Sequence, residues 1–141
     1  MAHDDEYLNR LADVPLFADL DRKHLEAVAS LGTDVSIEEG RELARQGDVA
    51  AEAFLVLEGT ARAERDGEEI ATFGPGDFFG EMALLVHGPR TATVVATSPM
   101  QVRAFHKSEF DDLLDRSPDV AVKILRTTAE RLLSAEDSAH H

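Results

Sequence analysis

Three residues between positions 80 and 90 have the chemical character needed to bind an anion. Gly80 can bring the backbone close to a ligand. Glu81 precedes a short apolar segment and is the expected start of a helix, and Arg90 follows a Gly88-Pro89 turn. Arginine offers a planar fork of N–H donors that matches two phosphate oxygens, and the N–H groups of a helix start favour the same anion. A carboxylate such as Glu81 would not serve a phosphate alone. The combination indicates a ligand that carries both a phosphate and a hydroxyl.

The overall charge of the chain draws attention to Arg90. The sequence has 28 acidic and 14 basic residues, which gives a formal net charge of -14 at pH 7. Such a surface repels nucleic acid, and no face rich in lysine and arginine occurs, so we expect no nucleic-acid partner. An acidic protein that still binds an anion needs a local positive group, and Arg90 supplies one.

The composition argues against several classes of protein. The 141 residues include no cysteine, so neither disulfides nor a thiolate metal site are expected. No stretch reaches the roughly 18 apolar residues of a membrane helix, and the N-terminus is too polar for a signal peptide, so we expect a cytoplasmic protein without a membrane partner. The histidines are scattered and no Gly-x-Ser-x-Gly motif occurs, so we expect no metal, no cofactor and no enzyme. The terminal His140 and His141 are either native or the remnant of a tag.

Helical periodicity marks the first part of the chain, about residues 4–31. The apolar residues of segment 4–12 have the spacing of one helix face. Asp19 or Asp21 is expected to cap a second helix, and Gly32 is expected to end it.

From Thr33 onwards the apolar residues alternate with polar ones, as is typical of β-strands. Glycine-containing turns separate the segments, among them Asp66-Gly67, which predicts a tight hairpin. The expected strands are residues 33–37, the surroundings of Leu43, and residues 53–57, 60–65, 69–73, 92–97 and 100–106. Short strands at regular spacing predict a mainly β sandwich or barrel over about residues 33–106.

Two helices are expected at the C-terminal end, over about residues 108–135. Ser108 is expected to cap the first, with Asp111 in a position like that of a capping box. Ser117-Pro118 is expected to begin the second, longer helix, and residues 136–138 are expected to fray. The apolar face expected for the longer helix consists of Val120, Ala121, Ile124, Leu125, Ala129, Leu132 and Leu133.

The order of these elements, together with three motifs, resembles the cyclic nucleotide-binding domain family. This family includes catabolite activator proteins, kinase regulatory subunits and the cytoplasmic domains of gated channels. The motifs are Arg45-Gln46-Gly47-Asp48, Gly76-Asp77-Phe78-Phe79-Gly80-Glu81 and Pro89-Arg90-Thr91-Ala92-Thr93-Val94. The resemblance implies one domain over residues 1–141, a jelly-roll-like β-roll with N-terminal helices, C-terminal helices, and a short helix in a phosphate-binding cassette at residues 79–94.

The resemblance also implies roles for the cassette residues. Arg90 would pair with the phosphate of a cyclic nucleotide, Glu81 would accept its ribose 2′-hydroxyl, and Gly80 would allow close backbone approach. The phosphate cradle would be completed by backbone N–H groups from Met82, Ala83, Thr91 and Ala92. The expected ligand is cAMP. The alternative is cGMP, because a threonine directly after the arginine accompanies cGMP preference in the kinase branch of the family.

The resemblance also implies a function for the long C-terminal helix. In the family such a helix closes over the base and transmits occupancy to an effector, and residues near Leu132, Leu133 and Ser134 would make this contact. In dimeric members the helix pairs with its mate, which allows a homodimer here. We therefore expect a regulatory sensor domain with an effector protein that the sequence does not identify. Two alternatives stay open: a regulatory fragment of a larger transcription factor, transporter or cyclase, and an interaction module of the same fold that binds no nucleotide.

Overall fold

The computed structural model describes residues 5–85 and 88–139, apart from the side chains of Met82 and of residues 135–139. The chain divides into two compact units, one formed by Leu31–Phe110 and the other by Met1–Ser30 together with Asp111–His141. The expectation of a single functional domain over residues 1–141 stays a prediction. The candidate site lies within the first of these units.

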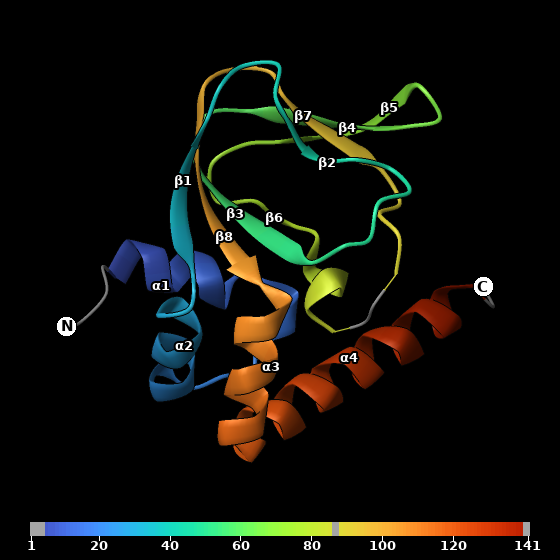
Figure 1. Ribbon diagram of the computed structural model, residues 1–141. Helices are drawn as coiled ribbons and strands as arrows, with labels where there is room; N and C mark the ends of the chain where they lie inside the picture. Colours follow the sequence, from blue (N-terminus) through green and yellow to red (C-terminus); the bar gives the residue numbers. More distant parts are fainter. Residues whose placement is uncertain (1–4, 86–87, 140–141) are drawn as a thin grey trace. The chain divides into compact units, whose positions relative to one another are not determined.

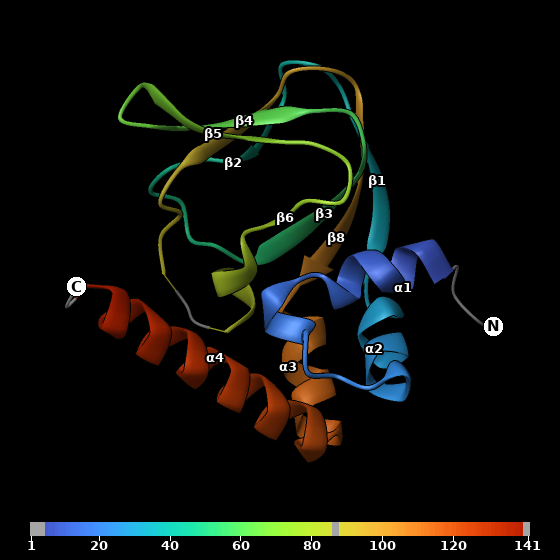
Figure 2. The same cartoon turned by 180° about the vertical axis from the view of Figure 1, so that it is seen from behind.

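Antiparallel strands form two four-stranded sheets in the unit Leu31–Phe110, with orders β1-β8-β3-β6 and β2-β7-β4-β5 (Figures 1 and 2). This arrangement confirms the expected mainly β fold, a β-roll with flanking helices. The strands are β1 (Thr33–Ile37), β2 (Glu42–Ala44), β3 (Glu52–Glu58), β4 (Ala61–Arg65), β5 (Glu68–Phe73), β6 (Phe78–Phe79), β7 (Thr93–Ala96) and β8 (Met100–His106).

The hydrophobic core of this unit is built from alternate residues of both sheets. Burial of these side chains is the main contribution to stability, at roughly 25 cal/mol per Å² of apolar area removed from water. Phe79 contacts Phe54 and Phe73 with ring centroids 5.2 and 4.8 Å apart, and Phe73 is only partly buried. The buried cluster consists of Ile37, Phe54, Val56, Ala61, Ala63, Phe79, Val94, Ala96, Met100, Val102 and Ala104.

The sequence pattern predicted that Gly32 ends the preceding helix, but the helix ends before it. That helix, α2 (Arg22–Ala29), ends at its C-cap Ser30. A Cβ atom on Gly32 would lie 2.3 Å from Cγ of Arg103, whose Nε donates to Asp34 Oδ1 at 2.7 Å. The glycine therefore makes room for a cross-strand arginine, a contact between residues too distant in sequence for a local pattern to reveal.

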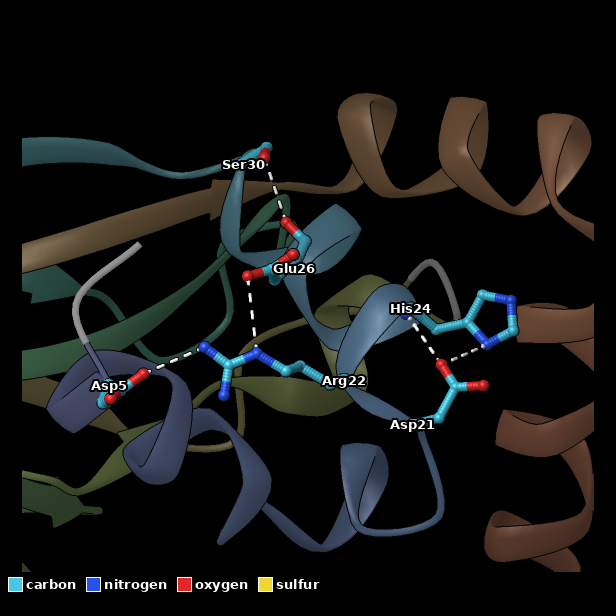
Figure 3. A network of polar contacts seen from close by, with 6 residues as sticks. All are labelled: Asp5, Asp21, Arg22, His24, Glu26 and Ser30. Carbon is cyan, nitrogen blue, oxygen red and sulfur yellow. Dashed lines mark hydrogen bonds and ion pairs between the residues drawn. The ribbon is translucent and has the colours of Figure 1, made fainter. Parts of the chain in front are cut away.

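The second unit contains α1 (Asp5–Ala12), η1 (Pro15–Phe17), α2 and α4 (Pro118–Ala139), while α3 (Lys107–Arg116) crosses the division between the units. Asp21 caps α2, as predicted for Asp19 or Asp21, by accepting a hydrogen bond of 2.9 Å from the His24 backbone N–H. This bond is the main cause that holds the pKa of the Asp21 carboxyl below its ordinary value. Figure 3 shows the cap beside Arg22, which pairs with Asp5 at 2.9 Å and with Glu26 at 3.8 Å.

The two C-terminal helices differ from the predicted ones at their ends. Helix α3 begins at Lys107, so Ser108 lies inside it and the predicted Ser108 cap is wrong. The capping contact comes instead from Glu109, whose carboxylate accepts from the His106 N–H at 3.4 Å. Helix α4 continues to Ala139, beyond the predicted end at about residue 135.

The predicted apolar face of α4 combines residues of two different faces. Val120, Ile124 and Thr127 are buried and lie on one face of the helix. The Thr127 hydroxyl donates to Asp19 Oδ2 at 2.7 Å. In contrast, Leu125, Leu132 and Leu133 are 69%, 64% and 61% exposed. At about 100° per residue these leucines turn away from the buried row. Periodicity alone did not separate the two rows because both are apolar.

Candidate ligand-binding site

The backbone of Arg90 is held on both sides by the turn that precedes β3. Its N–H donates to the Asp48 carbonyl at 2.7 Å, and its own carbonyl accepts from Gly47 at 2.9 Å. Ala50 donates to the Gly88 carbonyl at 2.9 Å, and Val49 and Pro89 form a bridge between these bonds. The motif Arg45-Gln46-Gly47-Asp48 thus fixes the position from which the arginine side chain starts.

The guanidinium of Arg90 lies directly against Gly80. Nη2 donates to the Glu52 backbone carbonyl at 2.7 Å. A Cβ atom on Gly80 would be 2.8 Å from Nη1 of Arg90 and 3.1 Å from the Glu52 carbonyl oxygen. Gly80 also has φ of +78°, a conformation that favours glycine. We expected a ligand to lie close to the Gly80 backbone, but in the structure the Arg90 side chain lies there.

Arg90 is a charged group in a half-buried position. Desolvation lowers its pKa from the ordinary arginine value, and the nearby Glu52 carboxylate opposes this shift. An arginine starts from so high a pKa that it keeps its charge at neutral pH. The bond to Glu52 uses one of the five N–H donors of a guanidinium, which leaves donors for two oxygens of an anion.

Arg90 borders a cavity of about 200 Å³ within the β-roll unit. Four of the predicted site residues meet there, namely Gly80, Arg90, Thr91 and Ala92. The remaining lining residues are Ala44, Ala63, Arg65, Ile70, Ala71, Phe73, Phe79 and Val94. A concave, mostly apolar cavity with a few polar groups is the usual form of a small-molecule site.

A second hollow, of about 280 Å³, is also lined in part by Arg90. Its wall carries the acidic residues Glu42, Asp48 and Glu52 beside Arg45. Three carboxylates disfavour a phosphate, so we assign the anion site to the apolar cavity. Among the residues that the structure describes, no group of three or more His, Cys, Asp or Glu side chains could hold a metal ion.

The predicted residues Glu81, Met82 and Ala83 lie in η2 (Glu81–Leu84), a short 3-10 helix at the predicted helix start. The Ala83 N–H donates to the Gly80 carbonyl at 3.0 Å, so a phosphate would have to replace this bond to use that donor. Glu81 is partly buried, and neither it nor Ala83 is among the residues that line the cavity. The Met82 side chain lies outside the described residues, as do residues 86–87 of the cassette.

The sequence reasoning missed the contribution of β4 and β5 to the cavity, which includes Arg65 and Ile70. Ala61, Ala63 and Arg65 occupy alternate positions of a strand, so alternation alone could have brought Arg65 to the inner face. Ile70 had no such signal. The register with β4 shifts between Ala63 and Glu64 and leaves Ile70 as the extra residue of β5.

Comparisons with known proteins show the family to which the chain is related. The family model described as "Cyclic nucleotide-binding domain" matches residues 34–117. The chain is 31% identical over 115 residues to a cAMP-dependent protein kinase regulatory subunit of Schizosaccharomyces pombe, covering 81% of this chain and 28% of that protein. It is 34% identical over 122 residues to a cyclic nucleotide-gated potassium channel of Rhizobium etli, covering 86% and 34% respectively. The chain spans about a third or less of the length of such curated relatives.

A solved structure is also similar over most of this chain. It is the N-terminal domain of a transcriptional regulator from Streptomyces coelicolor A3(2), with a TM-score of 0.83 and 32% sequence identity. The alignment covers 91% of this chain and 95% of that domain. The resemblance noted from the sequence motifs is thereby confirmed at the level of family and fold.

Proposed function

We propose, because this chain belongs to the cyclic nucleotide-binding domain family, that it is a sensor that binds cAMP and couples occupancy to movement of its C-terminal helices. The family is a regulatory, ligand-binding one rather than a catalytic one. Our preference for cAMP has support in a relative named a cAMP-dependent protein kinase regulatory subunit. The second candidate is cGMP, because Thr91, whose side chain carries a hydroxyl group, is among the residues that line the cavity.

The placement of Arg90 carries the proposal. Its guanidinium is half-buried, oriented by the Glu52 carbonyl, and borders the apolar cavity together with Thr91 and Ala92. A guanidinium in such a place binds a phosphate by two parallel charge-assisted hydrogen bonds. The apolar wall formed by residues such as Phe73 and Val94 suits the flat faces of a purine and its ribose.

The other cassette residues complete the proposed contacts. Glu81 accepts the ribose 2′-hydroxyl, and backbone N–H groups of Met82, Ala83, Thr91 and Ala92 donate to the phosphate. The Ala83 N–H becomes available when its 3-10 bond to Gly80 opens. One hydrogen bond in a four-residue helix is inexpensive to exchange because the ligand replaces it. Opening of η2 is then the first local change that the ligand causes.

Signal transmission in this proposal is a population shift. The ligand favours the conformation in which the cassette closes on the phosphate. The chain continues from β8 directly into α3 and then α4 (Figure 1), so a change in the β-roll has a covalent path to the C-terminal helices. Movement of α4 would be read by an effector protein of unknown identity. Hydrogen exchange of α4 with and without cAMP measures this directly, and unchanged exchange contradicts the coupling.

The oligomeric form that we propose is a homodimer through α4. Val122, Leu125, Ala129 and Leu132 are exposed at spacings of three, four and three residues. This is the a/d spacing of a two-stranded coiled coil. A second copy of α4 presents the same apolar row, so the two rows can cover each other.

Calorimetric titration with cAMP and cGMP tests the function. We expect Arg90→Leu to weaken binding by about 100-fold or more, because a charge-assisted hydrogen bond is worth about 1.5–3 kcal/mol and two are lost. Arg62→Leu is the matched control, since Arg62 lies in β4 and pairs with Glu64 at 2.6 Å. Titration with 2′-deoxy-cAMP tests the role of Glu81. The wild type should bind cAMP more tightly than 2′-deoxy-cAMP, and the variant Glu81→Ala should lose this preference.

Two alternatives make different predictions in the same titration. If neither nucleotide binds to the wild type at millimolar concentration, the chain is an interaction module of this fold without a nucleotide ligand. If binding is normal, the chain acts either alone or as the regulatory part of a larger transcription factor, transporter or cyclase, as the partial coverage of its relatives allows.

We propose no catalytic role, no nucleic-acid contact and a cytoplasmic location. In the described part of the chain, no helix has both the length and the apolar character to cross a membrane.

A further inference from the structure

The cavity wall carries a second guanidinium, that of Arg65, which lies outside the cassette of residues 79–94. Arg65 is the last residue of β4 and follows Ala61 and Ala63 at alternate positions. These two alanines are 1% and 4% exposed, so this face of β4 points into the core and brings Arg65 to the cavity. Arg62, on the opposite face of the strand, pairs with Glu64 instead.

Arg65 binds the peptide group between Thr91 and Ala92, directly after Arg90. Its Nε donates to the Thr91 carbonyl at 3.0 Å. A peptide group is planar, and the Thr91 carbonyl belongs to the same plane as the Ala92 N–H and points the opposite way. Fixing the carbonyl therefore fixes the direction of the Ala92 N–H. That N–H is one of the proposed phosphate donors.

A brace next to Arg65 keeps the hairpin end of β4 in place. The Gln46 side chain donates to Asp66 Oδ1 at 2.9 Å and accepts from the Asp66 backbone N–H at 3.0 Å. Its own backbone N–H donates to Thr93 Oγ1 at 2.9 Å. Asp66 has φ of +53°, and the paired bonds to Gln46 support this uncommon conformation. β4 and β7 are also neighbours in one sheet, so the hairpin end and the segment after Arg90 are held together (Figure 1).

We infer that Arg65 is a positioning residue of the nucleotide site, which orients the Thr91–Ala92 peptide toward the ligand phosphate. The inference rests on the proposed function, because it requires an anion beside Arg90. Arg65 acts through the hydrogen bond to the Thr91 carbonyl and not merely as a second positive charge. Preorganised donors bind an anion more tightly than donors that must first be oriented.

Salt and a charge-conserving substitution separate these two effects. We would titrate cAMP and cGMP by calorimetry into the wild type, Arg65→Gln, Arg65→Lys and the control Arg62→Gln, at 0.1 M and 1 M NaCl. At 1 M salt the Debye length is about 3 Å, so a simple charge effect is largely screened. The thermal midpoint of each variant is measured alongside to show that it is folded.

We expect Arg65→Gln to raise the Kd about tenfold at both salt concentrations, which corresponds to about 1.4 kcal/mol. Arg65→Lys keeps the charge but lacks the rigid Nε donor, so it should raise the Kd about threefold or more. Arg62→Gln should bind as the wild type does.

The inference is overturned if the Arg65 variants bind like Arg62→Gln, if Arg65→Lys binds like the wild type, or if the effect disappears at 1 M salt. Arg65→Lys decides the question alone if Arg65→Gln does not fold. A wild type that binds neither nucleotide overturns the proposed function and this inference together. A wild type that binds normally while Arg65 has no effect overturns the inference only.

Discussion

Replacing Gly80 with alanine should damage ligand binding far more than it damages the fold. The φ of +78° at Gly80 costs an alanine about 1–2 kcal/mol. The new Cβ would also lie 2.8 Å from Arg90 Nη1 and 3.1 Å from the Glu52 carbonyl oxygen. The backbone carbonyl belongs to β3 and is fixed, whereas the arginine is the end of a flexible side chain. We therefore expect Arg90 to move and the bond to Glu52 to break.

Gly76→Ala is the matched control for this substitution. Gly76 has φ of +92°, and no atom outside its neighbours lies within 4 Å of its hypothetical Cβ. Both variants should lose about 1–2 kcal/mol, which lowers the thermal midpoint of a domain of this size by about 3–8 °C. Only Gly80→Ala should also weaken cAMP binding, by about tenfold or more, because it displaces the guanidinium that we propose binds the phosphate. Equal affinities of the two variants in calorimetry would refute the argument that Gly80 makes room for Arg90.

Two further predictions concern the helices. Asp21→Ala should lower the thermal midpoint at pH 7. The pKa of Asp21 is lowered in the folded state by the His24 N–H, so its stabilisation is present above the ordinary carboxyl pKa of about 3.9 and is lost as the pH falls through and below it. The difference from the wild type should therefore shrink between about pH 5 and pH 3, and a constant difference contradicts the cap. Leu125→Ser with Leu132→Ser should convert a dimer into a monomer in sedimentation, whereas the control Arg126→Ser should not; a monomeric wild type refutes pairing through α4.

Much of the fold could be predicted from local patterns. Glycine turns, with alternation or in β3 a short apolar run, placed β3, β4, β5 and β8 within a residue or two. The ends of helices were harder. The predicted cap, Ser108, lies two positions after His106, the residue that precedes α3, and the deciding contact is the Glu109 carboxylate of the first turn, which accepts from the His106 N–H. Helix α4 is apolar on two faces, so its sequence could not say which face is buried.

The site was predictable only in its central part. Gly80 and Arg90 could be found because glycine and arginine have distinctive chemistry at this spacing. What holds them could not be found in the same way, since Asp48 and Glu52 contribute through backbone carbonyls. A backbone carbonyl is present at every residue, so no residue type signals its role. Arg65 contributes a side chain, but its partner is again a carbonyl, that of Thr91.

The choice of a carbonyl as the partner of Arg90 has a consequence for anion binding. Nη2 of Arg90 donates to the neutral Glu52 carbonyl and not to a carboxylate. A carboxylate partner would neutralise the guanidinium, and a phosphate would then have to displace an ion from a half-buried position, at the cost of leaving that ion unpaired. A carbonyl orients the side chain while its full charge stays available to the ligand. In a chain with a net charge of -14, the half-buried guanidinium thus donates a hydrogen bond to a neutral group, although the Glu52 carboxylate is near enough to raise its pKa. Arg65, which is exposed, is likewise held through its Nε by a carbonyl, that of Thr91.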